Sequence, residues 1–262
     1  MNTSGIYDLV AFTVDIDWVP DHLIDDMAQT FIDNKVKCTW FVTHSSPAVD
    51  RLKQSEYFQL GIHPNFHSGS SHGDSEEAVI EFCKRIVPDA RVTRMHALHQ
   101  NSYLLSKLQK AYGIDIDCSL FLPHAIHLAP HLFYHSHEHK PLLRIPFFWE
   151  DDVECLTPNK NWNFEPEILT TPGLKIFNFH PVYVGINETD FRQYLNIKKN
   201  LCSTKKLSDL ERDELQPYIH KDLGVKTYFK ALLSHINSHG ITTYWQTDIE
   251  DIFWANNKKM NA

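Results

Sequence analysis

Three consecutive segments near the N-terminus constrain the fold of this chain. An apolar run over residues 8–14 is followed by an amphipathic helical pattern over residues 22–34 and a second strand pattern over residues 37–43. A continuous apolar run of this length is typical of a strand buried on both faces of a parallel sheet. Strand, helix and strand within about 35 residues form a βαβ unit, whose parallel strands end at the same edge of the sheet. We therefore expect an α/β fold with its chemistry at the carboxyl ends of the strands.

Length and composition favour one globular enzyme domain. Of the 262 residues, 42% are apolar and 22% are charged, which is ordinary for such a domain, and we expect it to span residues 1–262. The polar, charge-rich segment near the C-terminus predicts a helical insertion at about 190–220, running over the outside of the domain. The last strand pattern, residues 241–245, precedes what we expect to be a short tail.

Charge and cysteine usage limit the partners and the compartment. The net charge is -8 with neutral histidines, and no run of Lys and Arg exceeds a pair, so we expect no nucleic-acid partner. Five scattered cysteines without a C-x-x-C pair favour reduced thiols. The first residues lack the features of a signal peptide, and no apolar stretch approaches the roughly 18 residues of a membrane span. We therefore expect a cytoplasmic protein without a membrane span, and the sequence leaves its oligomeric state open.

Acidic residues and histidines follow several of the predicted strands. Asp15 and Asp17 come directly after the first strand. His63 and His67 follow the third, and His180 follows a later buried strand. Carboxylate and imidazole groups are ligands of zinc and related divalent ions. Two histidines at this spacing are a weak signal in a chain with 17 His, but their place at the same sheet edge as the acids predicts a metal site.

Two further strand ends carry polar side chains. Arg94 and His96 follow the fourth strand pattern, and Trp149 with Asp151 and Asp152 follows the apolar run that begins near residue 142. A carboxylate at a strand end can also cap the next helix, so this position alone does not establish a catalytic role.

Two other patterns receive a structural interpretation. Asp115 and Asp117 form a second Asp-x-Asp, but the surrounding alternation of polar and apolar residues is typical of an edge or half-exposed strand. Six histidines lie within residues 124–139. A His-rich loop can bind metal, but such loops are more often solvated, and its role stays open.

The first two strand-end motifs resemble those of the NodB-homology polysaccharide deacetylases, carbohydrate esterase family 4. Residues 13–17, T-V-D-I-D, look like the family's T-F-D-D-G and point to a divergent branch with Asp-x-Asp. Residues 63–67 match the family's H-[ST]-x-x-H in spacing, with Pro64 at its second position.

The later motifs extend this resemblance from about residue 8 to residue 250. Arg94 is similar to the arginine of the third motif, residues 149–152 resemble the fourth, and residues 178–180 look like the fifth, L-x-H. The resemblance implies an α/β fold built as a distorted (β/α)7-type barrel, NodB-like in architecture.

The resemblance also implies a specific role for each of the strand-end residues. Asp17, His63 and His67 would hold a divalent metal ion, with Zn²⁺ the expected one, while Asp15 acts as general base and His180 as general acid. Two imidazoles and one carboxylate leave coordination positions open for water and substrate, as in hydrolytic zinc sites. A bound ion acidifies its water, which a nearby carboxylate can then deprotonate.

The remaining motif residues would support this machinery. Arg94 would orient Asp15, and either Asp151 or Asp152 would orient His180.

One departure from the family affects the substrate side of the site. Family members commonly carry Pro and Tyr after the arginine of the third motif, whereas this chain has Met95, His96 and Ala97. We predict that His96 contacts substrate instead, together with Trp18 and Trp149.

These residues predict a metal-dependent hydrolase that removes an N-acetyl or other N-acyl group from a sugar or glycan precursor, in surface polysaccharide biosynthesis. One alternative is hydrolysis of another non-peptide C–N bond, as in allantoinase-like or deformylase-like relatives. Another is a glycan-binding module without catalysis. Retention of both Asp15 and His180, which binding alone would not require, favours the enzyme.

Overall fold

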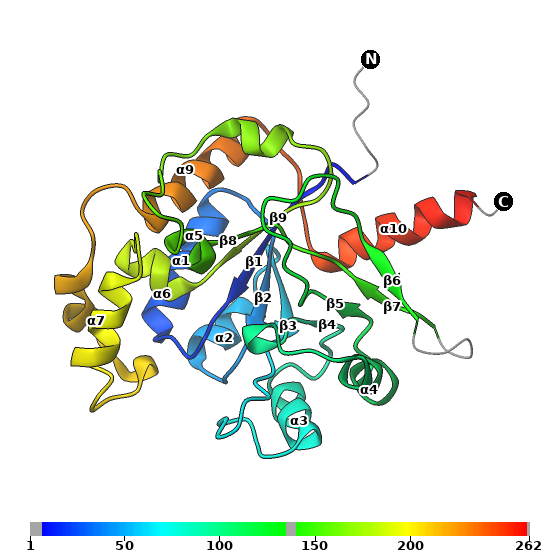
Figure 1. Ribbon diagram of the computed structural model, residues 1–262, viewed down its shortest axis with the longest axis horizontal. Coiled ribbons are helices and arrows are strands. Elements are labelled where there is room, and N and C mark those ends of the chain that lie inside the picture. Colours follow the sequence, from blue (N-terminus) through cyan, green and yellow to red (C-terminus); the bar gives the residue numbers. More distant parts are fainter. Residues whose placement is uncertain (1–6, 135–139, 261–262) are drawn as a thin grey trace.

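The computed structural model describes residues 7–134 and 140–260 and shows a curled sheet with helices around its outside (Figure 1). The strands are β1 Val10–Asp15, β2 Cys38–Val42, β3 Phe58–Ile62, β4 Val92–Thr93, β5 Ile116–Asp117, β6 His131–Phe133, β7 Leu142–Arg144, β8 Trp149–Glu150, β9 Lys175–Phe179 and β10 Thr243–Tyr244. Their order in the sheet is β6-β7-β5-β4-β3-β2-β1-β9-β8, with β10 paired to the start of β1. Every pair is parallel except β6 with β7. The α/β class is confirmed, and the sheet curls into a half-barrel.

Helices connect most of the parallel strands. The α-helices are α1 Asp21–Asp33, α2 Pro47–Leu52, α3 Glu76–Ile86, α4 Ser102–Tyr112, α5 Asp151–Cys155, α6 Pro181–Ile186, α7 Arg192–Asn200, α8 Arg212–Leu215, α9 Val225–Ser238 and α10 Gln246–Met260. Short 3-10 helices are η1 His96–Leu98, η2 Pro166–Thr170, η3 Leu207–Asp209 and η4 Gln216–Tyr218. Among these described elements, no helix combines the length and the apolarity that a membrane crossing requires.

Apolar packing against both faces of the central strands fixes this arrangement. All six residues of β1 are buried, as expected for a strand covered on both faces. The ring of Phe31 on α1 meets Phe12 of β1, Trp40 of β2 and Phe229 of α9 edge-on, at centroid distances of 5.8, 6.0 and 5.1 Å. Helices from distant parts of the chain therefore share one apolar layer against the sheet.

Two sequence predictions are wrong. The expected C-terminal tail is the helix α10, because Ile249 and Phe253 are buried four residues apart and Asp248 accepts a hydrogen bond from the Trp245 N–H over 2.9 Å. The predicted edge strand is β5, which lies between β4 and β7 inside the sheet. Its polar residue Asp117 is fully buried because it pairs with Arg144 over 2.7 Å.

Candidate active site

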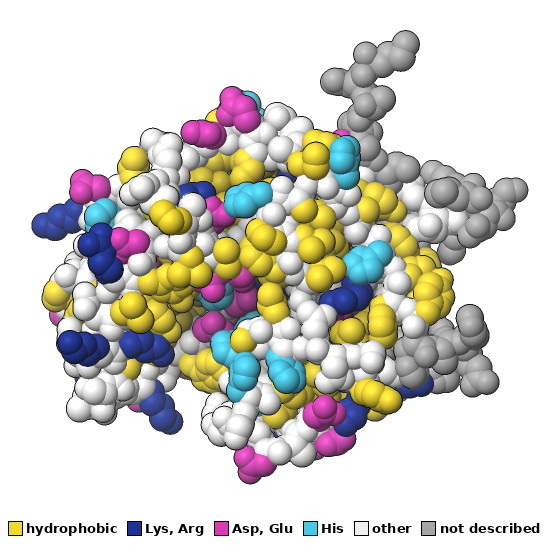
Figure 2. Space-filling model, in the orientation of Figure 1, with side chains coloured by type: hydrophobic (Ala, Val, Ile, Leu, Met, Phe, Trp, Pro, Cys, Tyr) yellow, Lys and Arg dark blue, Asp and Glu magenta, His cyan; other side chains and the backbone are white. Residues whose placement is uncertain are grey.

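A cavity of about 380 Å³ lies where several parallel strands end. Asp15 ends β1, His63 follows β3, and His180 follows β9, so each reaches the cavity from a neighbouring part of the sheet. Figure 2 shows acidic and histidine side chains in this hollow, surrounded by hydrophobic side chains. The parallel topology thus places Asp15, His63 and His180 at one edge.

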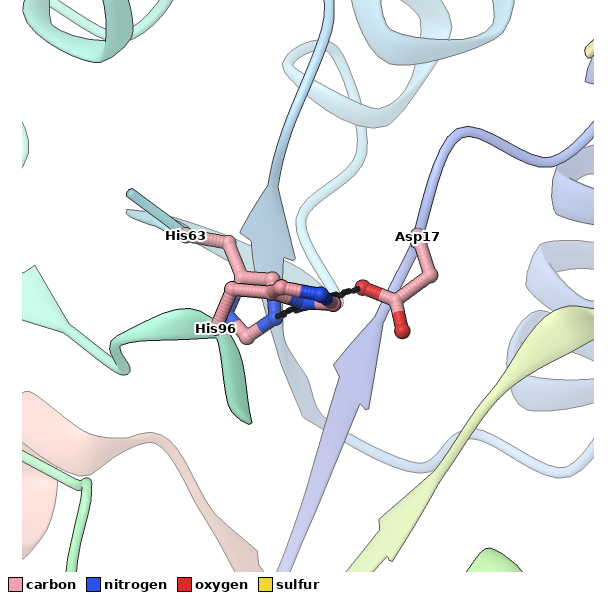
Figure 3. A group of neighbouring side chains, drawn as sticks. All are labelled: Asp17, His63 and His96. Carbon is pink, nitrogen blue, oxygen red and sulfur yellow. Dashed lines mark hydrogen bonds and ion pairs between the residues drawn. The ribbon is translucent and has the colours of Figure 1, made fainter. Parts of the chain in front are cut away.

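Asp17, His63 and His96 form a compact group in this cavity (Figure 3). The Oδ1 atom of Asp17 lies 3.3 Å from His63 Nε2 and 3.2 Å from His96 Nδ1. The two ring nitrogens lie 3.3 Å apart. Asp17 and Trp18 both have positive φ angles, 36° and 54°, so the chain turns sharply after β1 and carries the Asp17 carboxylate to the histidines.

The hydrogen bonds around this group suit ligation of a cation. His63 Nδ1 lies 2.7 Å from the carbonyl oxygen of Arg94, so Nδ1–H donates to it and Nε2 faces the cavity beside Asp17. The buried Asp17 Oδ1 has no hydrogen-bond partner among the described residues, although it faces both imidazoles. Burial raises the pKa of Asp17, but His63 and His96 outweigh this effect and hold the pKa well below its usual range.

The structure places His96, not His67, beside Asp17 and His63. The His67 side chain is exposed, and its ring centroid is 6.2 Å from that of His96. The chain turns away from the cavity after His63, and the His67 N–H donates to Asn65 Oδ1 over 3.0 Å. His96 is brought inward because its N–H donates to the Pro64 carbonyl over 3.0 Å. The structure therefore brings His96, and not the predicted His67, together with Asp17 and His63.

Asp15 lies deeper, held by several hydrogen bonds. Its Oδ1 accepts from Arg94 Nη1 over 3.2 Å, and its Oδ2 accepts from Asn178 Nδ2 over 3.1 Å. Arg94 is fully buried and also donates to Thr13 Oγ1 over 2.9 Å and to the Cys118 carbonyl over 3.1 Å. The predicted contact between Arg94 and Asp15 is therefore present in the structure.

Asn178 and Glu150 belong to the same network, and neither was predicted as a site residue. Thr13, Asn178 and Glu150 are direct neighbours across β1, β9 and β8. Asn178 Nδ2 donates to Glu150 Oε1 over 2.8 Å, and its Oδ1 accepts from Thr13 Oγ1 over 2.8 Å and from Arg94 Nη1. Burial, followed by the nearby Asp152 charge, raises the pKa of Glu150 well above its usual range. One local signal could have identified Asn178, because it lies two residues before His180 on the same face of the strand.

His180 is held by Asp151. Asp151 Oδ1 lies 2.7 Å from His180 Nδ1, and Oδ2 accepts from the His180 N–H over 2.8 Å. Burial lowers the pKa of His180, but Asp151 outweighs it and raises the pKa well above its usual range. Asp152 lines the cavity, and its buried Oδ1 has no hydrogen-bond partner among the described residues. Of the two candidates left open by the sequence, the structure places Asp151 against His180.

Comparison with known proteins identifies the family of this fold and site. The family model described as WbmS-like polysaccharide deacetylase matches residues 12–198. The chain belongs to the WbmS-like polysaccharide deacetylase family. No curated protein matches the chain.

Two solved structures share the fold of this WbmS-like chain. One is a Bordetella bronchiseptica protein described as a polysaccharide deacetylase involved in O-antigen biosynthesis. It is 24% identical, with a TM-score of 0.69 over 86% of this chain and 90% of that chain. The other is the peptidoglycan deacetylase PdaC of Bacillus subtilis, which is 10% identical, with a TM-score of 0.51 over 97% of this chain and 95% of that chain. The predicted NodB-like fold is thereby confirmed.

Neither tryptophan predicted to bind substrate lines the cavity that contains Asp15 and His180 in this WbmS-like protein. Trp149 is fully buried and stacks on Tyr228 at 5.0 Å, beside a separate cavity of about 330 Å³. Successive strand residues face opposite sides, so Glu150 points into the site and Trp149 points away from it. The Trp18 ring packs against His96, with its centroid 5.3 Å from that of His96 and 5.3 Å from that of His72.

Two tyrosines that sequence reasoning missed line the cavity instead. Tyr183 comes from α6 and Tyr194 from α7, and their rings meet edge-on at 5.1 Å. Tyr194 lies in the predicted insertion at about 190–220, so this segment borders the site of this WbmS-like protein rather than only covering the outside of the domain.

The described part of the His-rich loop, residues 124–134, does not line the cavity that contains Asp15 and His180. His124 Nε2 lies 2.7 Å from Glu154 Oε1, beside the separate cavity. Residues 135–139 lie outside the described residues.

Proposed function

We propose that this protein is a metal-dependent hydrolase that removes an N-acetyl or related N-acyl group from a sugar or glycan precursor. The observation that carries the proposal is the placement of Asp17, His63 and His96 in the same cavity as Asp15 and His180. This arrangement joins a candidate cation site to a carboxylate base and an imidazole acid, which are the parts that amide hydrolysis requires.

Asp17, His63 and His96 are the residues that would hold the metal ion. A set of two imidazoles and one carboxylate suits zinc, and the Arg94 carbonyl fixes the ring of His63, as outer partners of metal ligands usually do. When bound, such an ion supplies Lewis acidity, which acidifies water and polarises an acyl carbonyl.

Asp15 is the proposed general base. Arg94 and Asn178 each bond one of its carboxylate oxygens, so the carboxylate is held in one orientation before substrate arrives. In this orientation it accepts a proton from the attacking water. Its Oδ2 lies 3.9 Å from His180 Nε2, a distance that supports base and acid acting on the same reacting centre.

His180 is the proposed general acid. Its Nδ1–H donates to Asp151, so the proton that can be transferred sits on Nε2, toward the cavity. Nε2 delivers this proton to the nitrogen of the breaking amide bond. An unprotonated amide nitrogen is a poor leaving group, and a positioned acid typically contributes about 10²- to 10⁴-fold in rate.

We place the substrate among the N-acetylated sugars of surface polysaccharide biosynthesis. The similarity in fold to a protein described as acting in O-antigen biosynthesis supports this setting. We also propose a reducing compartment, the cytoplasm, because all five cysteines are unpaired.

The decisive test is acetate release from N-acetylated sugars, compared with release of product from allantoin and formyl amides. We expect acetate release only from the sugars, its loss after chelation and its recovery on adding Zn²⁺. Asp15→Asn should keep bound metal but lose activity, whereas Asp17→Ala should lose the metal, as measured by emission spectroscopy. Turnover that is insensitive to chelation, or hydrolysis confined to the other amides, would refute the proposal.

A further inference from the structure

A buried carboxylate fixes the segment that follows α6 beside the cavity. Glu188 is fully buried, and its side chain accepts hydrogen bonds from the backbone N–H groups of Thr189, Asp190 and Tyr194 over 2.9, 3.4 and 2.7 Å. Hydrogen bonds to a buried charged acceptor are stronger than those between neutral groups. The first turn of α7 is therefore held in place at the cavity wall.

The ring of Tyr194 continues a row of aromatic contacts that begins at the proposed acid. The His180 ring meets Tyr183 edge-on at 5.4 Å, and Tyr183 meets Tyr194 at 5.1 Å. Both tyrosines line the catalytic cavity. Tyr194 thus forms part of the cavity wall on the side of His180, the proposed acid.

One turn further along α7, Lys198 places a cation beside Tyr194, just outside the residues that line the cavity. Its Nζ atom lies 5.3 Å from the centroid of the Tyr194 ring, and its side chain is exposed. Arg192 bonds Asp190 and Lys205 bonds Glu214. Lys199 and Lys206 also lack an ion pair among the described residues, but only Lys198 lies against the Tyr194 ring. Lys198 has no carboxylate within ion-pair distance among residues 7–134 and 140–257. Figure 2 shows Lys and Arg side chains over α7 and the segment after it, on one side of the central hollow.

We infer that Lys198, together with Tyr194, binds an anionic group carried by the sugar whose N-acyl group enters the cavity. The inference rests on the proposed function and names its substrate class, a sugar that bears a phosphate or a carboxylate. The chain has a net charge of -8, so an anionic substrate is repelled as it approaches the protein. An ammonium group without a carboxylate partner offsets that repulsion, and the tyrosine ring offers a face to the sugar.

The test is direct binding by calorimetry, with three sugars and two matched variants. The probes are UDP-N-acetylglucosamine, an N-acetylated uronic acid and the neutral N-acetylglucosamine trimer. We expect at least one anionic sugar to bind the wild type on the order of 5- to 10-fold more tightly than the neutral one at low salt. Lys198→Gln should abolish this difference, whereas Lys199→Gln, which removes the same charge from the next residue of α7, should preserve it.

Each outcome decides the inference. A preference for the nucleotide sugar alone assigns a diphosphate, and a preference for the uronic acid alone assigns a carboxylate. Equal affinity for charged and neutral sugars, no binding of any probe, or an unchanged preference in Lys198→Gln overturns the inference. A charge preference without acetate release from any sugar would overturn the proposed function and leave the anion contact standing. Acetate release from the sugars without any charge preference would overturn the inference and leave the proposed function standing.

Discussion

The side-chain amide of Asn178 donates to Asp15 Oδ2 over 3.1 Å and to Glu150 Oε1 over 2.8 Å. Its carbonyl oxygen accepts from Thr13 and Arg94. One buried amide therefore connects the proposed base to the arginine that orients it and to a buried acid. In this network the buried Arg94 Nη2 has no hydrogen-bond partner among the described residues, whereas both oxygens of Asp15 are bonded.

Truncation of Asn178 should damage both activity and stability. Asn178→Ala leaves Arg94, Glu150 and Asp15 each without one partner, so we expect about 2–4 kcal/mol less free energy of unfolding and about 10²-fold slower acetate release. Urea unfolding and a deacetylation assay measure the two effects. Asn163→Ala, in an exposed loop, is the control and should match the wild type. Wild-type activity in Asn178→Ala would show that the network does not position Asp15.

The two adjacent acids at the start of α5 should differ in importance. Asp151 accepts hydrogen bonds from both the backbone and the ring of His180, whereas Asp152 makes no such bond. Asp151→Ala should therefore lower kcat by about 10²- to 10⁴-fold with little change in KM, because the acid loses its orientation but the binding surface remains. Asp152→Ala should lower kcat far less. Steady-state kinetics on both variants check this order, and the reverse order would contradict the assignment of Asp151.

Metal content should follow His96 and not His67. His96 Nδ1 lies 3.2 Å from Asp17 Oδ1, while the His67 side chain is exposed and outside the group. We expect His96→Ala to lose bound zinc and His67→Ala to retain it. Loss of one of three ligands weakens metal binding far more than loss of a nearby side chain that is not a ligand. Emission spectroscopy after dialysis gives the metal-to-protein ratio. Loss of zinc from His67→Ala alone would restore the ligand set predicted from the sequence.

Stability should fall in mild acid because of His72. This buried imidazole donates from Nε2 to the Thr43 carbonyl over 2.7 Å and accepts the Asn65 N–H at Nδ1 over 3.1 Å, so it has no room for a second proton. Burial lowers the pKa of His72 from 6.5 to about 4. Between these values the unfolded chain binds a proton that the folded protein does not, so the free energy of unfolding decreases as pH falls, by about 2–3 kcal/mol at pH near 4.5.

Urea unfolding at several pH values between 7 and 4.5 isolates this contribution. His72→Gln keeps the donor to Thr43 but cannot titrate, so its stability should decline less steeply than that of the wild type. His239→Gln, at an exposed position, serves as control and should follow the wild-type curve. Parallel curves for His72→Gln and the wild type would exclude His72 as the source of acid sensitivity.

The sequence by itself determined the α/β class and which strand ends carry the chemistry. Buried strands appear in the sequence as apolar runs, and amphipathic helices appear as apolar residues that repeat with the helical period. Both patterns can be recognised within a short stretch of sequence. Parallel strands in βαβ units end at one edge, so the order of strands and helices along the chain is enough to group Asp15, Asp17, His63 and His180. The roles proposed for these residues follow from the chemistry of carboxylate and imidazole side chains.

Only the tertiary structure decided which neighbours complete the site. The backbone bond from His96 to Pro64 brings in His96 instead of His67, and the register of β9 against β8 joins Asn178 to Glu150. Hydrogen bonds between distant segments likewise hold Asp151, and not Asp152, against His180. Such contacts depend on the paths of loops and on strand register. Both are fixed by hydrogen bonds between distant segments, so no local pattern of residues predicts them.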